Sequence, residues 1–320
     1  MATIDYKKLI CPKCKKKEII RYGRKKGKQL YFCKDCKKKF VVNRLKNKTY
    51  SPKIVINAIS YYNLGYTLDE TVKLINRRFK VKISIGSVHY WIKEFKNICS
   101  YWKFRPYVIK KYNKEKNKID IIEAFSFKHS GLSYNFMFHR PKLDILCHHF
   151  DFLGKFLIDM KKACPSNFFK EDERCSQLKI DVKIKKGGKY NQACRLADLA
   201  LRACYKNCER HNIVENFMLV NDSSTIACEV PVWFWEKNLD LGICGHIDLL
   251  QIRRGKIFVL DFKPGAFKEN HNKVTSQLFL YASGLSFRTK IPLKMFRCAW
   301  FDENVYYEFN PIDLNVKMLK

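Results

Sequence analysis

Two Cys-x-x-Cys pairs near the amino end constrain the fold of this chain most strongly. Cys11-Pro-Lys-Cys14 and Cys33-Lys-Asp-Cys36 are separated by 18 residues. Each pair forms a tight turn that directs two sulfurs towards one ion, and four thiolates at this spacing are typical of a tetrahedral Zn²⁺ site. The alternatives are a redox pair or four unrelated thiols. Because four thiolates leave no open coordination position, we expect a structural zinc ion that stabilises a hairpin too short to fold by burial alone.

The other ten of the fourteen cysteines show no such pairing. Most of them lie among apolar neighbours, where a buried free thiol is the expected state. Cys204 and Cys208 are one helical turn apart and form a weaker candidate for a ligand pair. The amino end has no apolar stretch of the signal-peptide kind, and no apolar run approaches the roughly 18 residues of a membrane span. We therefore expect a cytoplasmic protein with reduced cysteines and no membrane contact.

The net charge of +33 indicates a polyanionic partner. Residues 1–120 contain 33 of the 63 Lys and Arg residues but only 8 of the 30 Asp and Glu residues. Affinity for nucleic acids comes largely from the counterions that such charges release. We therefore expect DNA contacts in this first third of the chain, with RNA as an alternative. An apolar content of 47% excludes wholesale disorder, because it is enough for a folded core.

Residues 49–105 carry start signals for three short helices. Ser51-Pro52 places a capping Ser before a Pro, Thr67-Leu-Asp-Glu70 is a capping box, and Ser84-Ile-Gly-Ser87 begins the third helix. This spacing is typical of a helix-turn-helix, with Trp91 in the core and the third helix in the DNA major groove. The alternative is an ordinary three-helix bundle with a solvated polar face. The expected contacts to base edges are Ser87, His89 and Tyr90, and those to phosphates are Lys93 and Lys96.

From residue 120 the pattern changes to a mixed region of helices and strands. Strands are predicted from Glu229 to Trp235, from Ile243 to Gln251 and from Lys256 to Phe262, with a hairpin turn at Arg253-Arg-Gly255. The stretch from residue 106 to 119 is charged and poor in apolar residues, so it is predicted as a linker.

Two carboxylates and a lysine are expected to meet on these strands. Asp248 and Asp261 lie across a hairpin from each other, and Lys263 shares a strand face with Asp261. Two carboxylates suit Mg²⁺ or Mn²⁺, which keep water and phosphate oxygens as their other ligands. The lysine would orient or deprotonate the water that attacks a phosphodiester. The alternative is a structural Asp–Lys ion pair.

The runs RYGRKKGKQLYFCKDCKKKF and SIGSVHYWIKEF are similar to the "YGxxxGxQxYxCxxCxxxF" and "S-x-x-x-V-x-x-W" patterns of insertion-sequence transposases. This resemblance covers about the first 90 residues and implies a zinc ribbon followed by a DNA-binding helix-turn-helix. A transposase would continue into a ribonuclease-H-like domain with a D-D-E set, which the rest of this chain does not resemble.

Gly245-x-x-Asp248, Asp261-x-Lys263 and Gln277-x-x-x-Tyr281 resemble the PD-(D/E)xK nuclease superfamily, and the RecB-type and CRISPR-associated exonuclease branch most closely. The resemblance implies an α/β restriction-endonuclease-like domain with a mixed central sheet. It implies that Asp248 and Asp261 bind the metal, that Lys263 is the catalytic lysine, and that Gln277 and Tyr281 position DNA or the active site.

Some features depart from this family. A His that often serves as a further metal ligand is replaced by Asn191, a poorer ligand, and Glu229 is the expected substitute. His211 and His246 are interpreted as surface or core residues. The iron–sulfur cluster of some members is not expected, because Cys298 is the single cysteine after Cys244.

The sequence therefore predicts a multidomain protein. The expected parts are a zinc ribbon at residues 1–48, a helix-turn-helix domain at 49–105, a linker at 106–119 and a nuclease-like domain at 120–320. The expected function is metal-dependent DNA cleavage linked to mobile elements or defence. The alternatives are a non-catalytic DNA-binding regulator with a degenerate nuclease fold, and a transposase.

Overall fold

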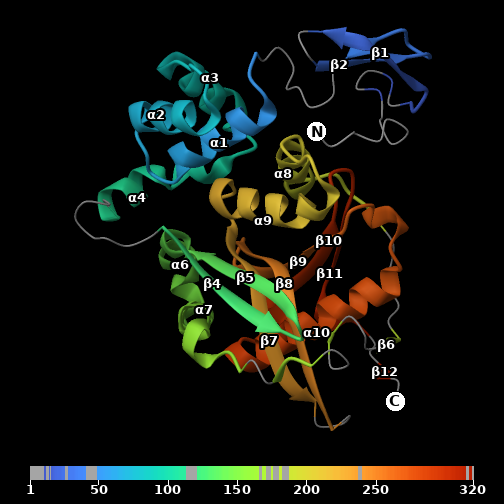
Figure 1. Cartoon of the computed structure of the whole chain (residues 1–320). Helices are drawn as coiled ribbons and strands as arrows, with labels where there is room; N and C mark the ends of the chain where they lie inside the picture. Colours follow the sequence, from blue (N-terminus) through green and yellow to red (C-terminus); the bar gives the residue numbers. More distant parts are fainter. Residues whose placement is uncertain are drawn as a thin grey trace.

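The computed structural model has a small amino-terminal sheet, a helical region and a large mixed sheet with helices on both faces (Figure 1). It describes residues 11, 14, 16–25, 28–40, 49–112, 121–165, 168–170, 174–175, 180–181, 187–236, 240–314 and 317–318. Among these residues, none of the helices combines the length and the apolar character needed to span a membrane.

The small sheet contains three antiparallel strands in the order β1-β2-β3. They are β1 (Ile19–Lys25), β2 (Lys28–Cys33) and β3 (Lys39–Phe40). Among the described residues, its buried core consists of Ile19, Tyr31, Cys11 and Cys33. A core of this size buries too little apolar surface to hold a fold by itself, so this part of the chain depends on the chemistry of its cysteines.

The helical region contains three helices followed by two shorter ones. They are α1 (Pro52–Asn63), α2 (Leu68–Phe79), α3 (Ile85–Phe95), η2 (Ser100–Lys103) and α4 (Arg105–Lys111). The predicted capping box is present, because Thr67 and Glu70 bond reciprocally at the start of α2. Ser84 accepts a hydrogen bond from the N–H of Ser87 and caps α3. The predicted starts of α2 and α3 are therefore confirmed.

The interior of the helical region is apolar. Ile75, Val88 and Trp91 are buried, which confirms the predicted core position of Trp91. The helix α4 occupies the beginning of the stretch predicted as a charged linker, and it buries Val108 and the following Tyr112. The remainder of that stretch, from residue 113 to 119, lies outside the described residues.

The large sheet has seven strands in the order β11-β10-β9-β8-β7-β5-β4. The strands are β4 (Ile122–His129), β5 (Leu132–His139), β7 (Thr225–Glu236), β8 (Leu241–Arg253), β9 (Lys256–Phe262), β10 (Phe296–Phe301) and β11 (Tyr306–Phe309). Neighbours are antiparallel except β9 and β10, which are parallel and are connected through α10 (His271–Thr289). The predicted strand from Lys256 to Phe262 is confirmed residue for residue. The turn before it has positive φ at Arg254 and Gly255, as a tight hairpin requires.

Helices cover both faces of this sheet, because side chains alternate between the faces along each strand. Leu250 and Val259 belong to a core with α7 (Asp151–Ala163) and α10, whereas Leu249 and Leu260 belong to a core with α8 (Gln192–Leu201) and α9 (Arg210–Asn221). The remaining elements are α6 (Arg140–Leu146), η3 (Cys147–His149), η5 (Asn207–Glu209), η6 (Ala266–Lys268), η7 (Leu293–Met295), η8 (Pro311–Asp313), and the paired strands β6 (Ile180–Asp181) and β12 (Lys317–Met318).

The helical region rests on α8 and α9, which lie between it and the sheet (Figure 1). The buried Asn63 at the end of α1 donates from Nδ2 to Oδ1 of Asn221 in α9 at 2.8 Å. Asn221 in turn donates to Oγ of Ser60 at 2.9 Å. Apolar residues of α1–α3, α8 and α9 form one continuous core. The α9 helix therefore couples the helical region to the sheet.

Candidate functional site

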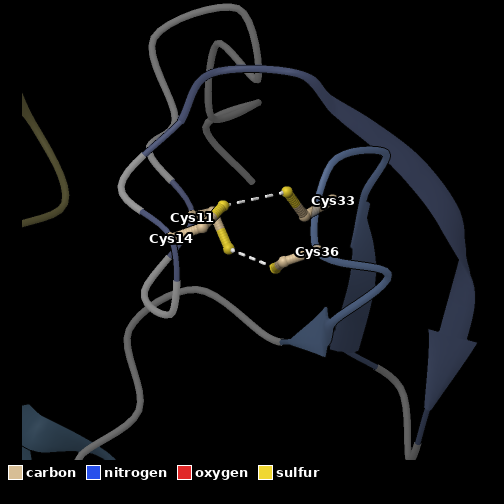
Figure 2. A group of neighbouring side chains, drawn as sticks. All are labelled: Cys11, Cys14, Cys33 and Cys36. Atoms are coloured by element: carbon tan, nitrogen blue, oxygen red, sulfur yellow. Dashed lines mark hydrogen bonds between the residues drawn. The ribbon is translucent and has the colours of Figure 1, made fainter.

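The four paired cysteines converge on one point at the edge of the small sheet (Figure 2). The sulfurs of Cys11 and Cys36 are 3.5 Å apart, as are those of Cys14 and Cys33. All four sulfurs lie within 4.8 Å of one another. A tetrahedral Zn²⁺ with Zn–S bonds of about 2.3 Å requires sulfurs about 3.8 Å apart. The predicted cluster is therefore present, and its ligand set and spacing fit a structural Zn²⁺ ion.

Three acidic residues lie in one row across β7, β8 and β9. The β7–β8 ladder pairs the residues on either side of Glu229 with those on either side of Asp248. The β8–β9 ladder ends at Leu249 and Leu260, so the next pair in its register is Asp248 with Asp261. The sheet thus places three carboxyl groups side by side, although like charges in one row repel each other.

The regular ladder of backbone hydrogen bonds between the strands is interrupted at this row. Oδ2 of Asp248 accepts a hydrogen bond from the N–H of Phe262 at 2.9 Å. Glu229 has a φ of 51°, in the left-handed region that side chains other than glycine rarely adopt. Strained backbone of this kind persists where surrounding structure enforces it, and it is frequent at functional sites.

Lys263 lies beside Asp261, directly after the end of β9. Its Nζ is 2.8 Å from Oδ2 of Asp261, and its backbone N–H donates to the carbonyl of Phe301. Burial lowers the pKa of Lys263, but the charges of Asp261 and Asp248 outweigh burial and raise the pKa. The lysine is the ion-pair partner of Asp261 and stays within reach of the carboxylate row.

The helix α9 adds two residues that sequence reasoning did not place at this site. Nδ1 of His211 lies 3.5 Å from Oδ2 of Asp248 and 3.9 Å from Oε1 of Glu215. Ligand atoms of these three residues all lie within 4.8 Å of one another. The spacing of His211 and Glu215, four residues apart, was a sequence signal for a pair on one helix face, but it did not indicate that this face lies beside Asp248.

Burial and mutual repulsion shift the acid–base behaviour of these groups. Burial, followed by the charges of Asp248, Glu229 and Asp261, raises the pKa of Glu215 well above its usual range. Burial and then Asp248 raise the pKa of Glu229 to about 8, and the same two causes raise that of Asp261. Burial acts to raise the pKa of Asp248 too, but hydrogen bonding to His211 and Asp261 and the charge of Lys263 lower it overall.

Gln277 and Tyr281 lie on one face of α10, four residues apart. Nε2 of Gln277 donates to Oη of Tyr281 at 2.8 Å, and both side chains are buried. The ring of Tyr281 packs against Gly245 of β8. A Cβ at Gly245 would lie 2.4 Å from Cε1 of Tyr281, so this approach requires glycine.

Asn191 and His246 have structural partners. Oδ1 of Asn191 accepts hydrogen bonds from the N–H groups of Ala193 and Cys194 and caps α8. His246 is buried with its Nε2 2.8 Å from Nδ1 of His129, in agreement with a core position. His211 differs, because its side chain is 46% exposed yet contacts Asp248. The interpretation of His211 as a surface residue missed that contact.

The residues predicted to contact DNA lie on α3 and, for Lys96, at its C-cap. Ser87 is half-buried, with its Oγ 3.0 Å from Oγ of Ser84, whereas His89, Tyr90, Lys93 and Lys96 are exposed. A surface pocket of about 330 Å³ brings three of them together with side chains from other elements. Its lining comprises His89, Lys93, Lys96, Tyr62, Ile92, Trp102, Arg105 and Pro106. Sequence reasoning omitted Trp102 and Arg105, although the basic and aromatic run YWKFRPY was a signal for them.

No protein-family model matches the chain, and no match is found among curated proteins or among solved structures. Its function is therefore inferred from its own residues. The chain combines a four-cysteine cluster, a helical region, and a carboxylate-rich site on a mixed seven-stranded sheet.

Proposed function

We propose that this protein is a divalent-metal-dependent nuclease that hydrolyses phosphodiester bonds in DNA. The observation that carries the proposal is the row of Glu229, Asp248 and Asp261 on adjacent strands, with the ammonium of Lys263 2.8 Å from Asp261. These are the residues that the resemblance to PD-(D/E)xK nucleases singles out. On this proposal the mixed sheet and its helices form a restriction-endonuclease-like fold.

A Mg²⁺ or Mn²⁺ ion fits the donor set. Oδ1 of Asp261 and Oε1 of Glu215 are buried and have no hydrogen-bond partner among the described residues. Leaving such oxygens unpaired is costly, and a cation would offset this cost. We propose that Asp248, Asp261 and Glu215 hold the ion, with His211 at its edge. When bound, the ion lowers the pKa of a coordinated water and neutralises charge that develops on the phosphate.

Lys263 has two roles in the proposed reaction. Its ion pair with Asp261 fixes the ammonium beside the carboxylate row. A fixed cation in a partly buried site hydrogen-bonds the attacking water and stabilises the negative charge on the phosphate oxygens. Tyr281 and Gln277 brace the neighbouring strand through Gly245, so they act as positioning residues.

The departure at Asn191 does not remove a ligand from this site. Asn191 caps α8 with its side chain, whereas His211 on the next helix lies 3.5 Å from Asp248. We propose that His211 takes the role that the family assigns to a histidine at the position of Asn191. This supports an active nuclease over a degenerate fold.

The amino-terminal part is proposed to direct the nuclease to DNA, as a zinc ribbon followed by a helix-turn-helix formed by α1–α3. Support comes from the four-cysteine cluster, the capped α2 and α3, and the exposed His89, Lys93 and Lys96 on α3 and at its C-cap. Replacing Lys93 and Lys96 together by Ala is expected to weaken DNA binding. The slope of log affinity against log salt concentration should fall by the amount that corresponds to about two phosphate contacts. An unchanged salt dependence would contradict this role for α3.

The experiment for nuclease activity uses zinc-loaded protein and labelled single-stranded, duplex and forked DNA. Each substrate is incubated with Mg²⁺, with Mn²⁺ or without a divalent ion, and chelators are avoided because they would also remove zinc. We expect cleavage with Mg²⁺ or Mn²⁺ by the wild type and by the control Lys155→Ala, an exposed lysine on α7. Lys263→Ala is expected to abolish cleavage. Binding without cleavage under every condition would contradict the proposal, and strand joining beside one repeat sequence would indicate a transposase.

A further inference from the structure

A cavity of about 150 Å³ adjoins the carboxylate row, and the proposed reaction leaves it without a role. Glu229 and Asp248 line its acidic side and belong to both the cavity and the row. The rest of its lining comes from β4 and the turn after it, from β5, β8 and α10, and from residues 169, 174 and 175. Anything that occupies the cavity therefore lies directly beside the proposed metal ion.

The walls of the cavity are stacked aromatic rings. The rings of Tyr134 and His246 are 3.5 Å apart and inclined by 5°, and those of His129 and Phe169 are 3.8 Å apart and inclined by 11°. A contact of 2.8 Å between His129 and His246 joins the two stacks. The rings are therefore held in place before any ligand arrives. Preformed aromatic surfaces of this kind bind nucleobases, because every base offers a flat π-face.

Arg174 supplies positive charge to the same cavity. Within the described part of the chain, its side chain makes no hydrogen bond or ion pair. A guanidinium that is not neutralised by a carboxylate is suited to bind phosphate through two parallel hydrogen bonds. The cavity thus has aromatic walls, a guanidinium that no described carboxylate neutralises, and the proposed metal ligands, which match the base and the phosphate of one nucleotide.

The size of the cavity limits its occupant. A cavity of ~150 Å³ admits about one benzene-sized ring, so a base pair does not fit. We infer that the cavity seats a single unpaired nucleobase of the strand being cut, with Arg174 on the phosphate of that nucleotide. This inference rests on the proposed nuclease function and adds a substrate class to it, namely a strand that is single-stranded or locally unpaired at the cut. Enzymes that act on one base commonly take it out of the stack in this way.

The test compares two ligands that differ only in the base. Thymidine 5′-monophosphate and 2-deoxyribose 5-phosphate are titrated against the zinc-loaded full chain in Ca²⁺, and binding is followed by saturation-transfer NMR. We expect the nucleotide to bind roughly tenfold more tightly than the sugar phosphate, as one stacked base provides. Arg174→Ala should lower the affinity for both ligands by the same factor, because both carry the phosphate. Tyr134→Ala should remove the difference between them, whereas Tyr205→Ala, at a half-exposed tyrosine outside the cavity, should leave it unchanged.

Equal affinities of the wild type for the two ligands would overturn the inference, and this comparison needs no variant. A preference for the nucleotide that survives in folded Tyr134→Ala would overturn it as well. No bond is cleaved in the titration, so an inactive nuclease does not alter its outcome. Conversely, if the protein cleaves DNA but shows no preference for the nucleotide, the cavity does not bind a base and the proposed nuclease activity is unaffected.

Discussion

Replacing the buried Lys142 by Met is expected to change how the stability of the protein depends on pH. Lys142 is fully buried in α6, and its Nζ donates to the carbonyls of Leu219 and Thr225. Its Nζ lies 5.0 Å from the ring centre of Tyr101, which belongs to η2 of the helical region. Burial lowers the pKa of Lys142 from 10.5 to about 7, although Asp222 and Cys228 act to raise it.

The sign of the effect follows from the lowered pKa. Between about pH 7 and pH 10.5 the unfolded chain keeps its Lys142 proton and the folded chain has lost it, so the unfolded state binds more protons and the free energy of unfolding rises with pH. Each pH unit in this window raises the free energy of unfolding by at most about 1.4 kcal/mol. Because of Lys142, the free energy of unfolding of the wild type should therefore rise by about 2 kcal/mol between pH 7 and pH 9.

Lys142→Met keeps an unbranched side chain of similar length and removes the titrating group. It also leaves two buried carbonyl groups without their donor, which costs about 1–3 kcal/mol each. This cost does not vary with pH, and the many buried thiols titrate alike in both proteins. The difference between variant and wild type therefore isolates Lys142.

The assay is urea unfolding of wild type, Lys142→Met and the exposed control Lys155→Met in reducing buffer between pH 7 and pH 9. We expect the variant to lose about 2 kcal/mol relative to the wild type as the pH rises, and the control to follow the wild type. A difference in unfolding free energy between Lys142→Met and the wild type that stays constant across this range would show that Lys142 does not have a lowered pKa.

Two further predictions concern the zinc cluster and the packing of β8. Cys33→Ser is expected to abolish binding of one Zn²⁺ per chain, measured by atomic emission. The amides of β1 and β2 should then exchange their hydrogens faster, while those of β8 stay protected. Equal protection of β1 and β2 in both proteins would contradict a metal-dependent fold. Gly245→Ala brings a Cβ within 2.4 Å of Tyr281 and is expected to cost about 1–3 kcal/mol of stability in urea. Adding Tyr281→Leu should recover part of this loss, and no recovery would place the strain elsewhere.

Features that depend on neighbouring residues were predictable from the sequence. The capping box of Thr67 and Glu70 forms over four residues, and the strand from Lys256 to Phe262 follows from a tight turn and an apolar run. The four cysteines were predictable because each short turn brings two sulfurs together and the hairpin of β1 and β2 between the turns brings the two pairs to one point. In each case local geometry alone decides the outcome.

Features that depend on docking between distant segments were not predictable. The contact of His211 with Asp248 requires α9 to lie across the face of β8, and no local pattern fixes that placement. The hydrogen bond between Asn63 and Asn221 joins residues 158 positions apart. The cavity walls likewise combine Tyr134, Phe169 and His246 from three separate segments. Periodicity within a segment indicates which face is buried but not which segment covers it.

Whether the carboxylate row cuts DNA is decided by a measurement that separates cutting from binding. Asp261→Asn keeps the shape of a buried side chain and removes its charge, while Asp198→Asn does the same at a surface ion pair of α8. Both variants and the wild type are assayed for DNA affinity by anisotropy in Ca²⁺ and for single-turnover cleavage in Mg²⁺. We expect equal affinities for all three proteins and cleavage by the wild type and Asp198→Asn alone. Cleavage by Asp261→Asn at the wild-type rate would contradict this expectation.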